Sequence, residues 1–148
     1  MQKKEVGKIL ELFISVKDEL NRTNKTNIDL DENGVKSDKF YGHNIQRSVL
    51  ITSTASYNLS TQNDIDMNYG QLGENILIDY NPYQLKEGTQ IIIGDVTLEI
   101  TQHCTLCKSL AKVNKRLPEL LKEHRGVFAK VISNGNIHKS DIIYLLDK

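Results

Sequence analysis

Short apolar segments separated by turn residues dominate this chain of 148 residues, and Thr89–Gln102 (TQIIIGDVTLEITQ) is the clearest of them. Apolar and polar residues alternate on both sides of Gly94-Asp95, a dipeptide that tolerates the positive φ of a tight hairpin turn. Asn134-Gly135, inside GVFAKVISNGNIHKSDIIYLL, is a second and stronger hairpin signal. We therefore predict two strand pairs in the second half of the chain.

The first half predicts further strands. Gly7–Lys17 (GKILELFISVK) carries apolar residues at period two and others on the opposite face, which is typical of a strand covered on both sides. Arg47–Ser53 and Gly73–Asp79 are shorter candidates, and Ile28–Leu30 is a short extended piece inside a loop rich in Asn and Asp. Helix signals are limited to residues 106–113 (LCKSLAKV) and Arg116–His124, where Pro118 is tolerable only near the first turn.

No repeat or linker interrupts the pattern, so we expect one domain spanning residues 1–148. The pattern predicts a mainly β fold, a closed or half-closed barrel with one or two short helices. Nineteen Lys and Arg residues balance 19 Asp and Glu residues, which argues against a nucleic-acid binder. We expect no membrane span, since no apolar run is long enough, and a cytoplasmic location, since the start lacks a signal-peptide pattern.

The only cysteines, Cys104 and Cys107, lie in ITQHCTLCKSL. A reducing compartment disfavours a disulfide between them. A position near a helix N-terminus, with Lys108 alongside, favours a thiolate. Thioredoxin-like chemistry needs a βαβ setting, and an iron–sulfur cluster needs more thiolates. A zinc site would need both cysteines, together with His103 and His124 as the other two ligands. It also stays open that either cysteine is simply a small buried apolar residue.

Three other segments gather polar residues. In YGQLGENILID, glycines 70 and 73 flank a turn before Glu74-Asn75, which suits either recognition of a polar heterocycle or a tight turn into a buried strand. In VKSDKFYGHNIQRSVLI, Arg47 suits a phosphate, although a solvated loop with an ordinary surface ion pair at Asp38 is the commoner arrangement. Arg125, in KEHRGVFAKV, suits capping of helix carbonyls.

The order of these segments resembles the MOSC family over roughly residues 7–146. The segments that carry the resemblance are, in order, GKILELFISVK, GVKSDKF, QRSVLIT, YGQLGENILID, LKEGTQIIIGDVTLEITQHCTLC and HRGVFAKVISNGNIHKSD. The resemblance implies a mainly β, barrel-like fold and a site for molybdenum cofactor or for its sulfur. The family usually has Gly-Asp where this chain has Ser37-Asp38 and Ser140-Asp141. We expect serine to make those turns with a negative φ.

The resemblance assigns Cys107 as the working thiol, a sulfur carrier or a ligand to molybdenum, whereas Cys104 matches a cysteine of only some members. It also matches Arg47, Glu74, Asn75 and Arg125 to polar positions that line the site or brace its turns. For the phosphate of molybdopterin, Arg47 and Lys39 are the first choices and Arg125 the second. Glu74, Asn75 and the backbone of the 70–73 turn are expected to recognise the pterin edge.

The resemblance implies two functions, a third stands as an alternative to them, and whether the protein is an enzyme stays open. The first is reduction of a small N-hydroxylated or related substrate at the molybdenum cofactor, with electrons from a partner protein. The second is a sulfur carrier with a persulfide on Cys107, loaded by a sulfur-donor protein. The third is a non-enzymatic binding domain. The family is also associated with pyridoxal phosphate binding.

Overall fold

The structure is a computed structural model, and it describes residues 3–19, 22–104, 114–122 and 126–146. The described strands are β1 (Lys3–Ile14), β2 (Thr23–Lys25), β3 (Asn27–Asp31), β4 (Gly34–Val35), β5 (Val49–Ser53), β6 (Ile76–Ile78), β7 (Gln90–Ile93), β8 (Val96–His103), β9 (Val127–Ser133), β10 (Gly135–His138) and β11 (Ile142–Leu146). The α-helices are α1 (Thr54–Gln62) and α3 (Leu117–Leu120), and the 3-10 helices are η1 (Ile45–Arg47) and η2 (Pro82–Gln84).

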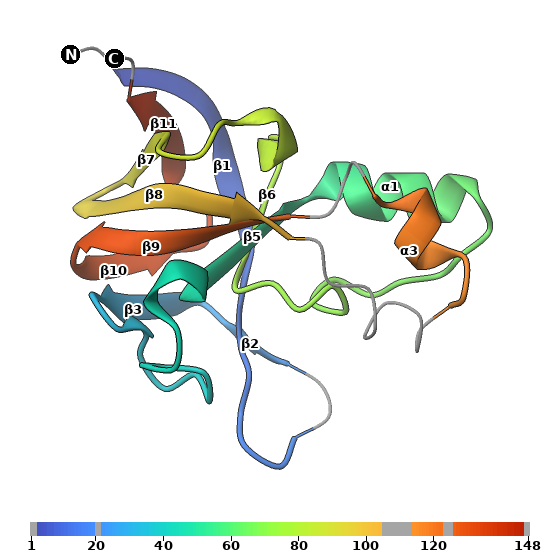
Figure 1. Cartoon of the computed structure of the whole chain (residues 1–148), viewed down its shortest axis with the longest axis horizontal. Helices are drawn as coiled ribbons and strands as arrows, with labels where there is room; N and C mark the ends of the chain where they lie inside the picture. Colours follow the sequence, from blue (N-terminus) through green and yellow to red (C-terminus); the bar gives the residue numbers. More distant parts are fainter. Residues whose placement is uncertain (1–2, 20–21, 105–113, 123–125, 147–148) are drawn as a thin grey trace.

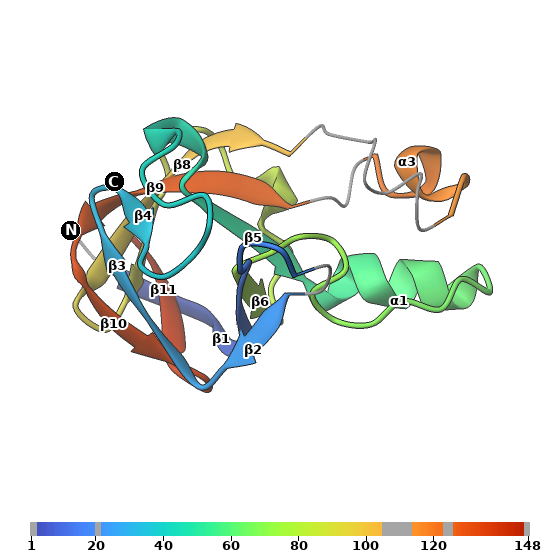
Figure 2. The same cartoon turned by 90° about the horizontal axis from the view of Figure 1, so that it is seen from below.

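Seven strands form a closed barrel in the order β1-β11-β7-β8-β9-β5-β6, which returns to β1 (Figures 1 and 2). Closure depends on β11, because this strand pairs with both β7 and β1. Strand β2 adds to β1, and β10, β3 and β4 form a second, smaller sheet. The fold is therefore mainly β and barrel-like, as predicted, and a closed barrel leaves no sheet edge along its ring.

Strands β5 and β6 are the parallel pair of the barrel, with Ile51 opposite Ile76. Parallel neighbours cannot be joined by a tight turn, so the chain between them must cross over. Helix α1 begins this crossover directly after β5, with the Ser53 side chain accepting a hydrogen bond from the Ala55 amide. Figures 1 and 2 show α1 and α3 together beyond the end of the barrel. No helix in the described ranges is long and apolar enough to cross a membrane.

Alternation along β5 and β9 divides their side chains between two faces. Val49, Ile51, Val127 and Ala129 belong to the large aliphatic core that fills the barrel. The intervening Leu50 and Phe128 lie directly opposite each other in the antiparallel pair, so they share the outer face. The smaller sheet adds apolar side chains to the same core: Ile28, Leu30, Val35 and Ile137.

Several predicted elements are confirmed. The Thr89–Gln102 hairpin is present as β7 and β8, with Ile93 opposite Val96 and Gly94 at φ +59°. The extended piece at Ile28–Leu30 lies inside β3. The strand predicted at Arg47–Ser53 begins at Val49, because Asn44 caps η1 immediately before it. The strand predicted at Gly73–Asp79 is confined to β6.

The prediction of a hairpin at Asn134-Gly135 is wrong. Strand β9 pairs with β8 and β5, whereas β10 pairs with β3 of the smaller sheet. The glycine serves close packing instead, because a Cβ on Gly135 would lie 2.9 Å from Val96 Cγ2. A pairing partner more than 100 positions away in the sequence has overridden the local turn preference.

The expectation of negative φ at the two serine turns is also wrong. Ser37 has φ +72° and Ser140 has φ +74°, the left-handed region that glycine adopts without a Cβ penalty. Of the predicted helices, α3 lies within Arg116–His124 with Pro118 in its first turn, as expected, and residues 123–124 lie outside the described ranges. The helix predicted at 106–113 lies outside them as well, and α1 was not predicted.

Candidate functional site

Three mostly buried side chains, Leu50, Cys104 and Phe128, form a small cluster on the outer face of the barrel. Cys104 directly follows β8, and its amide donates a hydrogen bond to the Gly126 carbonyl at 2.9 Å. A Cβ on Gly126 would lie 2.2 Å from the Ile51 carbonyl oxygen, so only glycine lets the start of β9 approach β5 this closely. The strand ends around the cluster are therefore fixed by backbone contacts.

Arg47 covers one side of this cluster. It ends η1, and its guanidinium carbon lies 4.4 Å from the centre of the Phe128 ring, a cation–π geometry. Its Nε is buried and has no hydrogen-bond partner among the described residues. The turn that carries it is anchored by the Thr101 hydroxyl, which donates to the Gln46 carbonyl. A fixed arginine with an unused buried donor is suited to binding an anion.

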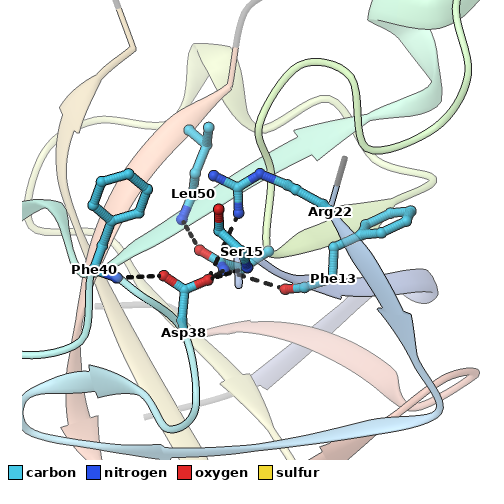
Figure 3. A network of polar contacts seen from close by, with 7 residues as sticks. Phe13, Ser15, Arg22, Asp38, Phe40 and Leu50 are labelled. Carbon is cyan, nitrogen blue, oxygen red and sulfur yellow. Dashed lines mark hydrogen bonds and ion pairs between the residues drawn. The ribbon is translucent and has the colours of Figure 1, made fainter. Parts of the chain in front are cut away.

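Asp38 lies at the centre of a polar network near Leu50 (Figure 3). Its Oδ1 accepts hydrogen bonds from the Ser15 amide at 2.6 Å and from Asn75 Nδ2 at 3.3 Å, and its Oδ2 accepts from the Phe40 amide at 3.0 Å. Arg22 Nη1 lies 3.7 Å from Oδ1, close enough for an ion pair. The Asp38 side chain is only 7% exposed, so the solvated surface pairing considered from the sequence is not what the structure has.

Asn75 joins Asp38 to the outer-face cluster. Its Oδ1 accepts a hydrogen bond from the Leu50 amide at 3.1 Å, and its Nδ2 donates to the Phe13 carbonyl at 3.2 Å. Its own amide donates to the Leu50 carbonyl at 2.9 Å. The Asn75 side chain therefore satisfies backbone groups of β1 and β5 just before β6, which fixes the position of Leu50.

Glu74 and Tyr57 form a buried pair behind the 70–73 turn. The Tyr57 hydroxyl donates to Glu74 Oε2 at 2.5 Å and accepts from the Gly70 and Leu72 amides at 3.0 and 3.3 Å. Burial raises the pKa of the Glu74 carboxyl, while the Tyr57 hydroxyl acts against that shift. Burial and the Glu74 carboxyl likewise raise the pKa of Tyr57. These bonds occupy amides of the turn that were expected to face a pterin.

Arg22 reaches the same region from the loop before β2. A Cβ on Gly73 would lie 3.7 Å from Arg22 Nη2 and 3.9 Å from Leu50 Cδ2, so both side chains meet at this glycine. Burial lowers the pKa of the Arg22 guanidinium, and the charge of Asp38 opposes the shift. Figure 3 shows the guanidinium above Asp38, on the Leu50 side.

The predicted site residues are thus partly brought together. Asn75 is hydrogen-bonded to Leu50, Arg47 packs on Phe128 of the same cluster, and Glu74 pairs with Tyr57 behind the 70–73 turn. Lys39 is exposed, and its Nζ lies 5.1 Å from the centre of the Phe40 ring. Cys107 and Arg125 lie outside the described residues. Their binding roles remain predictions.

His103 and Cys104 face different neighbours, as their adjacency in a strand predicted. The His103 ring stacks on Tyr83 with centres 4.4 Å apart, and its Nε2 is buried without a hydrogen-bond partner in the described part of the chain. Within the described ranges, no three His, Cys, Asp or Glu side chains form a group able to hold a metal ion. Cys107 and His124, the other members of the zinc set considered, lie outside those ranges.

Sequence reasoning missed Arg22 and Tyr57. Arg22 stands in an Asn- and Asp-rich loop with no periodic signal, and only the folded chain brings it to Asp38. Tyr57 lies in α1, and Ser53 at the end of an apolar strand was the available helix-start signal.

Solved structures with this fold include the YUAD protein from Bacillus subtilis, with a TM-score of 0.84 and 17% identity over 97% of this chain and 98% of that one. YiiM from Geobacillus stearothermophilus has a TM-score of 0.70 and 12% identity over 99% and 76%. YiiM from Escherichia coli has a TM-score of 0.71 and 14% identity over 95% and 70%. At these identities the likeness concerns the fold.

A search of curated proteins found no match. The family model described as "MOSC domain" matches residues 37–144. This stretch contains Asp38, Arg47, Glu74 and Asn75 and runs from the turn before η1 into β11. The chain therefore belongs to the MOSC domain family, which is associated with molybdenum cofactor binding.

Proposed function

We propose that this domain binds the molybdenum cofactor beside the outer face of β5 and β9, with Cys107 as thiolate ligand to the metal. We further propose that it acts in the reduction of small N-hydroxylated or related substrates. The observation that carries the proposal is Arg47, a fixed cation whose buried Nε has no hydrogen-bond partner within the described ranges. It lies against Phe128, which clusters with Cys104, three positions before Cys107.

The residues fit the phosphate end of such a cofactor. A guanidinium offers donors in a planar fork that matches two phosphate oxygens. Stacking on Phe128 orients Arg47 without using its nitrogen donors, so they stay available for a ligand. Lys39, which is exposed, and Arg125 are the further cations we assign to this phosphate. Glu74 and Asn75 are assigned to the pterin side, where they also hold the turn and the strand in place.

When bound, the molybdenum cofactor supplies a metal centre that exchanges electrons with the substrate, and a soft thiolate is an appropriate further ligand for it. Reduction of an N–OH group to N–H consumes two electrons and two protons and releases one water molecule. A partner protein supplies the electrons. The chain's own contribution is to bind and orient: Arg47 attracts the phosphate by its charge, and Phe128 holds the guanidinium in position.

The test is metal and pterin analysis of the protein purified from a host that makes molybdenum cofactor. Wild type, Cys107→Ala and the matched control Cys104→Ala are compared, with molybdenum, zinc and released pterin quantified in each. We expect molybdenum near one per chain in the wild type and in Cys104→Ala, and its loss in Cys107→Ala. Arg47→Gln is expected to lower the pterin content.

Two outcomes would contradict the proposal. Absence of molybdenum and pterin from the wild type would rule out stable retention of the cofactor. Mass spectrometry for a persulfide on Cys107 would then test the sulfur-carrier function. Zinc lost equally from both cysteine variants would instead establish a site that uses Cys104 and Cys107 together.

A further inference from the structure

Arg22 is a second cation at this site, mostly buried, with a donor that no acceptor in the described part of the chain uses. Its Nη1 is buried without a hydrogen-bond partner among the described residues, although the side chain as a whole remains 17% exposed. A buried donor left unpaired lowers the stability of the folded chain, and more so when the group is charged. We infer that Arg22 forms an oxyanion-binding position beside Leu50 and Gly73, one that takes a carboxylate or phosphate group of a ligand.

Asp38 neutralises part of the charge without satisfying the donor. Its Oδ1 already accepts from the Ser15 amide and from Asn75 Nδ2, and the distance of 3.7 Å to Arg22 Nη1 is too long for a hydrogen bond. Its Oδ2 accepts from the Phe40 amide. Asp38 therefore holds the loop and attracts the guanidinium, but it leaves the fork of N–H donors to another acceptor.

Glu74 does not supply that acceptor. Its Oε2 accepts from the Tyr57 hydroxyl and lies 3.3 Å from the Gly70 amide. Its Oε1 is buried without a hydrogen-bond partner in the described part of the chain. The charges of Asp38 and Glu74 both act on the Arg22 guanidinium, yet neither carboxylate forms a hydrogen bond with its Nη1 among the described residues, and an added anion would supply that acceptor.

A glycine lies beside Arg22. Gly73 has φ +89°, and a Cβ there would be in van der Waals contact with Arg22 Nη2 at 3.7 Å and with Leu50 Cδ2 at 3.9 Å. The combination of an apolar side chain, a bare backbone and a fixed cation favours a small acidic group attached to an apolar body.

This position is separate from the one assigned to Arg47. Arg47 packs on Phe128, on the β9 side of Leu50, whereas Arg22 meets Leu50 at Gly73, before β6. The inference therefore goes beyond cofactor binding. It concerns a second acidic group, and it can be tested on protein that contains no cofactor.

The experiment is an NMR titration of the ¹⁵N-labelled apoprotein that follows the arginine Nε–Hε signals. Inorganic phosphate and acetate are added in separate titrations at constant ionic strength. The Arg22 signal is assigned from Arg22→Lys. We expect it to shift saturably with at least one anion, and the anion that binds more tightly identifies the acid class.

In Arg22→Gln, where that signal is absent, the titration is followed at the Gly73 backbone amide, and binding is expected to weaken about tenfold, the loss that corresponds to one charge-assisted interaction. Arg116→Gln is the matched control, because Arg116 is exposed and donates to the Asn63 carbonyl at 3.2 Å. An Arg22 signal unmoved by both anions would overturn the inference, as would equal affinity in Arg22→Gln. If Arg22→Gln fails to fold, the wild-type titration decides by itself. Loss of cofactor retention would not affect either result.

Discussion

Replacing Tyr57 by phenylalanine removes the one oxygen atom that holds together the 70–73 turn and the buried Glu74 carboxyl. Three hydrogen bonds disappear, one of them fully buried and two partly buried, since Tyr57 is 4% exposed and Glu74 is fully buried whereas Gly70 and Leu72 are half-buried. The Gly70 amide and Glu74 Oε2 keep each other as partners at 3.3 Å. The Leu72 amide loses its acceptor and the Glu74 carboxyl loses its shortest hydrogen bond, at about 1–3 kcal/mol each. We expect Tyr57→Phe to lower the free energy of unfolding by about 2–4 kcal/mol.

The loss of stability caused by Tyr57→Phe should grow with pH. Burial raises the pKa of Glu74 above its usual 4.5, so the folded state binds this proton more tightly than the unfolded state. The free energy of unfolding is then highest below pH 4.5 and falls as the pH rises toward the folded-state pKa. The Tyr57 hydroxyl opposes the raised pKa, so phenylalanine raises it further and extends the fall to higher pH. Each unit of pKa corresponds to about 1.4 kcal/mol.

Urea unfolding at several pH values between 5 and 8 would measure both effects. Tyr69→Phe is the matched control, because Tyr69 contacts the same ring edge-on at 4.9 Å but is 48% exposed. It should change the free energy of unfolding by less than about 0.5 kcal/mol. In a Glu74→Gln background, Tyr57→Phe should lose its dependence on pH. Equal losses in Tyr57→Phe and Tyr69→Phe would refute the role given to this hydroxyl, and a loss independent of pH would refute the account of Glu74.

Two further substitutions test backbone features. Gly126→Ala should lower the free energy of unfolding in urea by about 3 kcal/mol, because its Cβ would lie 2.2 Å from the Ile51 carbonyl oxygen. The control Gly88→Ala, at φ +88° with open space around it, should lower it by only about 1–2 kcal/mol. Equal losses of stability in the two variants would contradict the steric argument. Ser37→Gly should raise the free energy of unfolding by about 0.5–1 kcal/mol, and with it the thermal midpoint, since Ser37 has φ +72°. Ser133→Gly, in a strand, should lower the midpoint, and the same sign for both would argue against the backbone account.

The parts of the fold that followed from the sequence are those set by local pattern. Alternation and the Gly94-Asp95 turn were sufficient for the β7–β8 hairpin, since both strands and their connection lie within one short segment. Asn134-Gly135 has an equally clear local signal, yet β10 pairs with β3 from the other half of the chain. Such pairing depends on which strand edge is open in the folded barrel, and no short window of sequence contains that information.

The site divides in the same way. Arg47, Glu74 and Asn75 could be named in advance because they stand in segments with a recognisable family pattern. The structure places Asn75 against Leu50 and Arg47 against Phe128, whereas Glu74 pairs with Tyr57. Arg22 and Tyr57 could not, because each acquires its partner only in the folded chain: Asp38 lies 16 positions from Arg22, and Glu74 lies 17 positions from Tyr57. Their own segments, a polar loop and a helix rich in Ser and Thr, carry no apolar period that would distinguish them.

The location of the site follows from how the barrel is filled. Aliphatic side chains such as Val49 and Ile51 occupy the interior, which leaves the other face of β5 to Leu50 and Thr52. These outward side chains are also buried, so the segments that cover them must form hydrogen bonds with the polar groups at the strand ends. Asn75 forms such a hydrogen bond with the Leu50 amide. Buried donors of Arg22 and Arg47, in contrast, remain unpaired in the described part of the chain. A folded chain retains such donors at a cost of stability, and binding an anion there would recover it.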